Sequence, residues 1–126
     1  MVKDEINFAK AYLDLLKGRF ENGFTFKIKI DEKTKEKYIV STILQQVLEN
    51  VVKHNEINET HPVEVVISTA ENSIIVENNK NAKLASTKTS QKGIDNIKKR
   101  IAFFTDEKVI INTTEGIYKI QLPILE

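Results

Sequence analysis

The most informative stretch of this chain is ILQQVLENVVKHN, residues 43–55. Its apolar side chains, together with Val40, recur at three- and four-residue steps, and this spacing predicts a helix with one buried face. The side chains that point away from that face are Gln45, Gln46, Glu49 and Lys53. Asn50 and His54 lie one turn apart at the edge of the apolar stripe. A helix that covers a sheet can present its edge residues to a cleft, so these two side chains are candidates for a binding site.

Two more helices and five strands are predicted around this segment. One helix is expected within residues 6–20, and another is expected to begin at Gly93. The expected buried face of the latter consists of Ile94, Ile97, Ile101 and Phe104. Alternating residues predict strands at residues 24–30, 63–67, 74–77, 109–113 and 117–122. Because hairpins dominate, we expect an α+β fold, a two-layer α/β sandwich whose mixed, mainly antiparallel sheet is covered on one face by helices.

Two segments show no apolar period. Residues 31–37 are charged, which is typical of a solvated loop. Residues 79–92 form a longer polar stretch, and a structureless segment of that length in a compact domain is usually a functional lid or disordered. We therefore expect a lid between the strand that ends at Glu77 and the helix that begins at Gly93.

Length and composition exclude several classes of protein. The chain has 126 residues, a length typical of one domain, and 19 Lys and Arg against 18 Asp and Glu give a formal net charge of +1. This balance argues against a nucleic-acid groove. The chain contains no cysteine, which excludes disulfides, thiolate zinc sites and thiol catalysis. No two glycines stand in a G-x-G relation, which excludes the Walker and Rossmann phosphate loops. No apolar run approaches the roughly 20 residues of a membrane helix, so we expect a soluble domain.

Three polar features lie at the ends of predicted elements, and each has an ordinary structural interpretation. The block that runs from Glu49 to Asn55 can form a solvated helix face with a local Glu49–Lys53 pair. Residues 77–79 can be the end of a strand followed by a turn. Gly93 can permit a turn, or backbone N–H groups at a helix N-terminus beside it can bind an anion. Taken one at a time, none of the three features separates a structural role from a binding role.

Together and in this order, the three features resemble the Bergerat-fold ATP-binding domain of gyrase, MutL, heat-shock chaperones of the ninety-kilodalton class and histidine kinases (the GHKL superfamily). Within this group the chain is most similar to the catalytic domain of LytS/YehU-type sensor histidine kinases. Residues 44–55 resemble the N box, residues 75–79 the adenine-binding box, and residues 93–100 the glycine box and its helix. Residues 5–20 resemble the segment that joins the dimerisation helices to the catalytic domain, and residues 118–123 resemble the terminal strand.

The resemblance implies a role for each matching residue and implies ATP and Mg²⁺ as cofactors. Asn50 would ligate Mg²⁺ through its side-chain oxygen, Glu49 would orient or polarise the attacking group, and Asn78 would bind the adenine amino group. The residues implied on the phosphate side are Lys53, His54, Lys92, Gly93 and Asn96. One asparagine oxygen is a sufficient protein ligand, because Mg²⁺ keeps several waters and takes the remaining oxygens from the triphosphate. Phosphoryl transfer then needs positioning and charge neutralisation more than covalent help.

The resemblance also implies a larger protein around this chain. Residues 1–22 would be a linker helix from an upstream dimerisation region, and residues 23–126 would be the histidine kinase-like ATP-binding domain. The intact protein would be a homodimeric protein-histidine kinase that phosphorylates a histidine on a missing upstream helix and serves a response regulator. The domain would be cytoplasmic, would reach the inner membrane only through missing upstream segments, and would bind no nucleic acid.

Three positions depart from the pattern of that family. Asn78 replaces the usual aspartate, Asn79 or Lys80 replaces the glycine that follows it, and Gln91 replaces the first glycine of G-x-G. A neutral amide accepts a hydrogen bond with less charge assistance than a carboxylate, and a side chain restricts the approach of backbone to phosphate. The alternative is therefore a degenerate Bergerat-fold module without turnover, used for dimerisation or docking. Titration with Mg·ATP and Mg·ADP distinguishes the two hypotheses.

Overall fold

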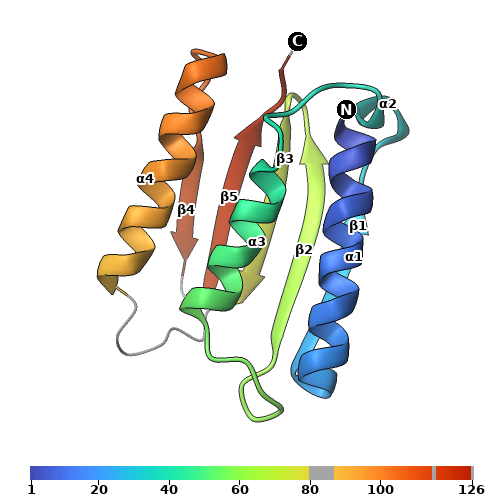
Figure 1. Cartoon of the computed structure of the whole chain (residues 1–126), viewed down its shortest axis with the longest axis vertical. Coiled ribbons are helices and arrows are strands. Elements are labelled where there is room, and N and C mark those ends of the chain that lie inside the picture. The colour runs from blue at the N-terminus through green and yellow to red at the C-terminus, as the bar shows by residue number, and fades with distance from the viewer. Residues whose placement is uncertain (80–86, 115, 126) are drawn as a thin grey trace.

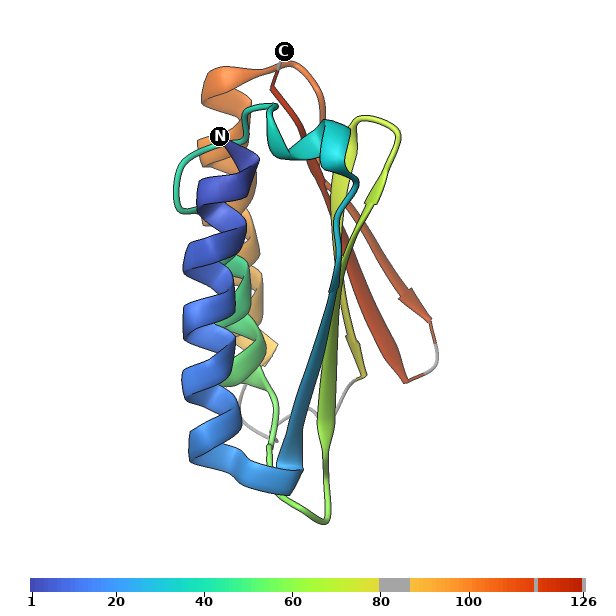
Figure 2. The same ribbon diagram turned by 90° about the vertical axis from the view of Figure 1, so that its right-hand side faces the viewer.

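Three long helices cover one face of a five-stranded sheet (Figures 1 and 2). The computed structural model describes residues 1–79, 87–114 and 116–125. The helix layer consists of α1 (Val2–Phe20), α3 (Ile43–His54) and α4 (Thr87–Phe104). Two short helical segments, η1 (Glu21–Gly23) and α2 (Glu32–Lys35), connect the layers. The α+β sandwich expected from the sequence is confirmed.

The sheet is mixed, and its strands lie in the order β1-β2-β3-β5-β4. The strands are β1 (Phe24–Lys29), β2 (Val63–Ala70), β3 (Ser73–Asn79), β4 (Ile110–Thr114) and β5 (Ile117–Pro123). In the described part of the chain β1 and β2 are parallel, and the other three pairs are antiparallel. The parallel pair needs a crossover, and α3 lies in it, which places this helix over the middle of the sheet.

The hydrophobic core lies between the helices and the sheet. The buried side chains that α1 contributes are Val2, Ile6, Ala9, Leu13 and Leu16. Those of α3 are Ile43, Leu44, Val47, Leu48 and Val51, which confirms the apolar stripe predicted for this helix. The α1 residues belong to the same core cluster as the strands, so α1 packs as part of one unit with the rest of the chain. The assignment of residues 1–22 to a linker from another region stays a prediction.

Two details of the first half of the chain differ from the prediction. Residues 31–37 are not a solvated loop throughout, because they contain α2, in which Thr34 is buried and Lys35 Nζ lies 2.9 Å from Glu32 Oε1. The central helix begins at Ile43 rather than at Val40, although Val40 is buried as an apolar residue should be. Val40 is apolar and fits the helical spacing, so from the sequence alone its burial in the loop looked like one more turn of the helix.

The second half contains the larger corrections. Helix α4 begins at Thr87, six residues before Gly93, so Gly93 does not open a helix. The expected lid is correspondingly shorter: Asn79 ends β3, residues 87–92 belong to α4, and residues 80–86 lie outside the described residues. The polar residues that precede Gly93 lack an apolar period, but they include no proline that would stop a helix. Phe104 is exposed at the last residue of α4, where its ring meets that of Phe103 edge to face with centroids 5.3 Å apart, and is not on the buried face.

Arg100 on α4 fixes this helix against the N-terminal end of α3. Its Nη1 donates to Gln46 Oε1 at 2.6 Å, and its Nη2 donates to Thr42 Oγ1 at 3.1 Å and to the carbonyl oxygen of Ser41. Glu5 of α1 lies near the same end, where burial raises the pKa of its carboxyl group while a backbone hydrogen bond from Thr42 opposes the rise. These contacts set how α3 lies between its two neighbouring helices.

Candidate functional site

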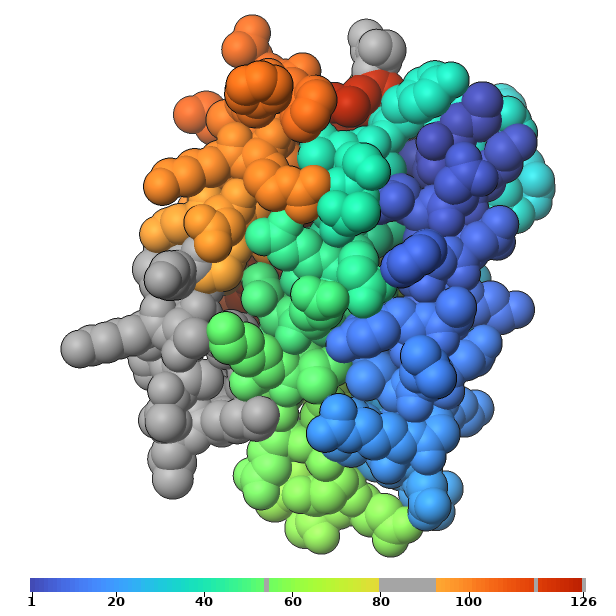
Figure 3. Space-filling model, in the orientation of Figure 1, coloured from blue at the N-terminus to red at the C-terminus, as the bar shows by residue number. Residues whose placement is uncertain are grey.

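The three polar features singled out in the sequence gather at one end of the molecule. The end of α3, the end of β3 and the beginning of α4 all lie at the lower end in Figure 1. On the helix side α3 lies between α1 and α4 (Figure 3). Features that are separated by about forty residues of sequence are therefore brought to the same edge of the α/β sandwich.

Asn50 lies on the side of α3 that faces α4. Gln46, one turn earlier on the same side, is the residue that accepts the hydrogen bond from Arg100 of α4. Asn50 is half-buried, and its carboxamide lies against Gly93: a Cβ built on Gly93 would be 2.8 Å from Asn50 Oδ1 and 2.9 Å from Asn50 Nδ2. The outer edge of the amide thus points at the backbone of α4. The prediction that Asn50 lies at the edge of the apolar stripe is confirmed.

Asn78 lies on the face of the sheet that the helices cover. Ile74 and Val76 are core residues of β3, and side chains alternate along a strand, so Asn78 shares their face. Its side chain is buried, and its Nδ2 donates to the carbonyl oxygen of Asn79 at 3.0 Å. This bond fixes the orientation of the amide and leaves Oδ1 as its acceptor. An acceptor at this position suits a ligand that presents an N–H group.

Asn79 ties the end of β3 to the beginning of β2. Its Oδ1 accepts from the backbone N–H of Glu64 at 2.7 Å, and its Nδ2 donates to the carbonyl oxygen of Pro62 at 2.7 Å. The paired residues of β2 and β3 end with Val65 opposite Asn78, so the Asn79 amide continues this antiparallel pairing through a side chain. Asn79 therefore has a defined structural role in holding Asn78 in place.

Tyr118 of β5 pairs directly with Asn78 across the sheet and was missed by the sequence analysis as a site residue. Ile120 and Leu122 of β5 are core residues, so Tyr118 lies on the same helix-covered face. Burial raises the pKa of its phenol from 10.0 to about 12, so the hydroxyl keeps its proton well into the alkaline range. Only the register between β3 and β5 reveals this neighbour, and the register cannot be read from the sequence without the turn geometry.

Glu49 lies on the side of α3 that faces α1, about 100° around the helix axis from Asn50. Its Oε1 accepts from Gln45 Nε2 at 3.3 Å, and its charge acts on Tyr12 of α1. The pKa of Tyr12 is raised first by burial and second by the Glu49 carboxylate. The structure therefore does not place Glu49 and Asn50 side by side, although they are adjacent in sequence.

The residues implied on the phosphate side are placed only in part. Lys53 is exposed near the end of α3, and Asn96 is exposed in the middle of α4 rather than at its start. The side chains of His54 and Lys92 lie outside the described residues. The expectation that Gly93 stands at a helix N-terminus is wrong, because an interior helical N–H group is used by the carbonyl four residues earlier.

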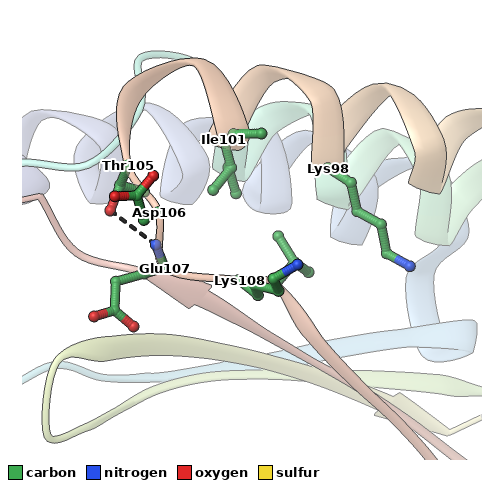
Figure 4. Close-up of a pocket in the computed structure, with 8 residues that line it drawn as sticks. Lys98, Ile101, Thr105, Asp106, Glu107 and Lys108 are labelled. Carbon is green, nitrogen blue, oxygen red and sulfur yellow. Dashed lines mark hydrogen bonds between the residues drawn. The ribbon is translucent and has the colours of Figure 1, made fainter.

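A surface pocket lies away from these residues, at the C-terminal end of α4 (Figure 4). It is lined by positively charged, negatively charged and apolar side chains. At its edge Thr105 Oγ1 accepts a hydrogen bond from the backbone N–H of Glu107 at 3.1 Å. Within the described ranges, no three His, Cys, Asp or Glu side chains gather closely enough to hold a metal ion. None of the helices described here has the length and apolar character needed to span a membrane.

Solved structures with the same architecture include the cytoplasmic segment of one histidine kinase and the catalytic domain of another. The chain superposes on the cytoplasmic segment of histidine kinase QseC with a TM-score of 0.64 and 12% identity, over 99% of this chain and 75% of that one. The catalytic domain of histidine kinase ThkA gives a TM-score of 0.61 and 12% identity, over 95% and 90% of the two chains. This is the fold of a histidine kinase catalytic domain.

Two comparisons by sequence found no relative of this chain. No protein-family model and no curated protein matches the chain. Histidine kinase AdeS of Acinetobacter baumannii gives a TM-score of 0.58 at 9% identity, and the match covers 96% of this chain but 64% of AdeS. The likeness to sensor histidine kinases inferred from the sequence is thus confirmed at the level of the fold, and the LytS/YehU subtype stays a prediction.

Proposed function

We propose that this chain is the ATP-binding catalytic domain of a two-component sensor histidine kinase. The observation that carries the proposal is that Asn50 lies against Gly93 and that β3, which carries the buried Asn78, ends at the same edge of a sandwich with the histidine kinase fold. Three different elements supply these residues, and a domain that served only as a scaffold would not need them at one place.

The nucleotide would lie at this edge, with its adenine over the sheet. The Oδ1 of Asn78 would accept from the adenine amino group, and the neutral phenol of Tyr118 lies on the neighbouring strand. The opposite wall consists of α3 and α4, where the Asn50 carboxamide lies against the backbone of Gly93. Lys53, His54, Lys92 and Asn96 are the residues proposed on the phosphate side.

Mg²⁺ fits a site of this composition only as a metal shared with the nucleotide. Asn50 offers one oxygen ligand, and no acidic cluster stands beside it in the described part of the chain. Mg²⁺ prefers oxygen ligands and keeps several waters, so one amide oxygen and the triphosphate oxygens can hold it. The metal would neutralise charge on the phosphates during transfer.

The phosphoryl acceptor would be a histidine on an upstream helix of the intact, homodimeric kinase, with a response regulator as the next partner. Of the two histidines here, His54 ends α3 within the proposed phosphate side. His61 lies exposed before β2, and its Nδ1 is 3.3 Å from Asn58 Oδ1. In-line transfer needs the two reacting atoms about 3–3.5 Å apart. We therefore expect no label on this chain after incubation with γ-labelled ATP, and label on the upstream helix when it is supplied.

One observation favours the alternative, a degenerate module without turnover. Gly93 lies inside α4, where its backbone N–H is engaged in the helix and does not face a phosphate. Together with the replacements at Asn78 and Gln91, this reduces the number of groups that can hold a nucleotide. A module of that kind would keep the fold and bind no nucleotide.

Isothermal titration with Mg·ATP separates the two functions. The wild-type chain should bind ATP more tightly in the presence of Mg²⁺ than in EDTA, and Asn50→Ala should bind equally under both conditions. Glu56→Ala, a change at an exposed residue just beyond α3, is the matched control and should keep the Mg²⁺ effect. A wild-type chain that binds neither Mg·ATP nor Mg·ADP would establish the degenerate module instead.

A further inference from the structure

Two of the glycines lie inside helices and differ in their surroundings. Gly18 lies in α1, and a Cβ added to it would meet nothing within 4 Å. Gly93 is the seventh residue of α4, and a Cβ added to it would lie 2.8 Å from Asn50 Oδ1, 2.9 Å from its Nδ2 and 3.1 Å from its Cγ. Distances below 3.0 Å are shorter than any ordinary contact of a methyl carbon with a polar atom.

A glycine inside a helix is less favourable than alanine by about 1 kcal/mol, so a packing reason is needed for it. At Gly93 the reason is visible: the space of the missing Cβ is filled by the Asn50 carboxamide. The three distances are similar, which means that the amide presents its outer edge, with both Oδ1 and Nδ2, to the backbone of α4. An alanine here would force this amide into another rotamer.

We propose that Gly93 is a positioning residue for Asn50. Because Gly93 has no side chain, the Asn50 carboxamide has room to keep its orientation. The role is steric and does not need the Gly93 backbone to approach a phosphate. It rests on the proposed function only for its consequence, which is that the orientation of Asn50 affects the Mg²⁺-dependent binding of ATP.

The contact between α3 and α4 leaves little freedom to accommodate a change at Gly93 in any other way. Seven residues further along α4, Arg100 is bonded to Gln46 and to the N-terminal end of α3, so the two helices cannot easily move apart. The atoms that meet the added methyl are the far end of a flexible side chain, so the amide moves and the fold survives. Gly93→Ala should therefore be a folded protein with a displaced Asn50.

A cycle of thermal unfolding measurements tests the contact without any nucleotide. Gly18→Ala should raise the melting temperature by about 4 °C, because alanine is the better helix residue. Gly93→Ala should raise it by less than half as much in the wild-type background, and by the full amount when Asn50 is also alanine. If Gly93→Ala raises the melting temperature equally in both backgrounds, the steric role is excluded.

Spectroscopy and binding then report on Asn50 itself. In ¹H–¹⁵N spectra the side-chain amide signals of Asn50, assigned by their loss in Asn50→Ala, should shift in Gly93→Ala and stay in place in Gly18→Ala. The Mg²⁺-dependent affinity for ATP should fall about tenfold in Gly93→Ala, as is common when a residue that orients a metal ligand is changed, with no further loss in the double variant. Unshifted Asn50 signals would overturn the proposal. If the wild type binds no Mg·ATP, the proposed function fails while the unfolding cycle still decides the contact.

Discussion

The two ends of the contact between α3 and α4 use polar side chains in opposite ways. At the N-terminal end of α3, Arg100 is bonded to Gln46, to Thr42 and to a backbone carbonyl. At the other end the Asn50 carboxamide lies against Gly93 and is proposed as a ligand of Mg²⁺. Polar groups that are hydrogen-bonded within the protein stabilise the fold, whereas a metal ligand contributes mainly to binding. The comparison predicts that changes at the first end cost stability and that changes at the second cost binding.

The largest loss of stability is expected for Arg100→Met. The variant keeps most of the side-chain volume but removes three hydrogen bonds from a charged donor, at a cost of about 2 kcal/mol in the free energy of unfolding. Urea unfolding measures this loss, and Lys99→Met, a change at the exposed neighbour, should stay within about 0.5 kcal/mol of wild type. Equal losses in the two variants would show that the Arg100 contacts contribute nothing specific.

Asn79→Ala should cost less, about 1 kcal/mol, although Asn79 lies at the ligand end. The difference from Asn50 is that both polar groups of Asn79 are bonded to β2, so this residue belongs with Arg100 in the stabilising class. Asn112→Ala on the edge strand β4, where the side chain is exposed, is the control. A loss of ATP affinity in Asn79→Ala without loss of stability would contradict this classification.

A further effect appears only at alkaline pH and involves Tyr118. Its pKa is raised by burial from 10.0 to about 12, so the folded chain holds the phenolic proton more tightly than the unfolded chain does. The corresponding stability is complete below pH 10 and is lost as the pH rises from 10 to about 12. Urea midpoints at pH 9 and pH 11.5 should fall more in wild type than in Tyr118→Phe. Tyr38→Phe, at an exposed tyrosine, should behave as wild type does.

The sequence was sufficient to predict the elements of the fold because their patterns are local. The alternation in β1 to β5 and the apolar stripe of α3 appear in the structure at nearly the predicted residues. The beginning of α4 was missed, because the polar stretch before Gly93 carries no apolar period and its several Ser and Thr residues suit a loop as well as a helix cap. A helix held by its later turns can extend through such a stretch.

The candidate site was only partly predictable for a different reason. Asn50 and Asn78 were identified from their motifs, but which residues face them depends on helix packing and strand register. Glu49 is adjacent to Asn50 in sequence but faces α1 while Asn50 faces α4, whereas Tyr118 is forty residues from Asn78 and pairs with it. Contacts of this kind are set by tertiary structure, and a single sequence contains no direct signal for them.

The most direct test of the account is to map a nucleotide onto the ¹⁵N-labelled chain by NMR, with Mg²⁺ and a non-hydrolysable ATP analogue. We expect the largest changes in backbone amide signals at Asn50 and Gly93, which lie against each other on α3 and α4, and at Asn78 and Tyr118, which pair between β3 and β5. The signals of residues 101–109, around the pocket of Figure 4, should stay in place. Changes confined to that pocket, or an unchanged spectrum at saturating analogue, would contradict the proposed site.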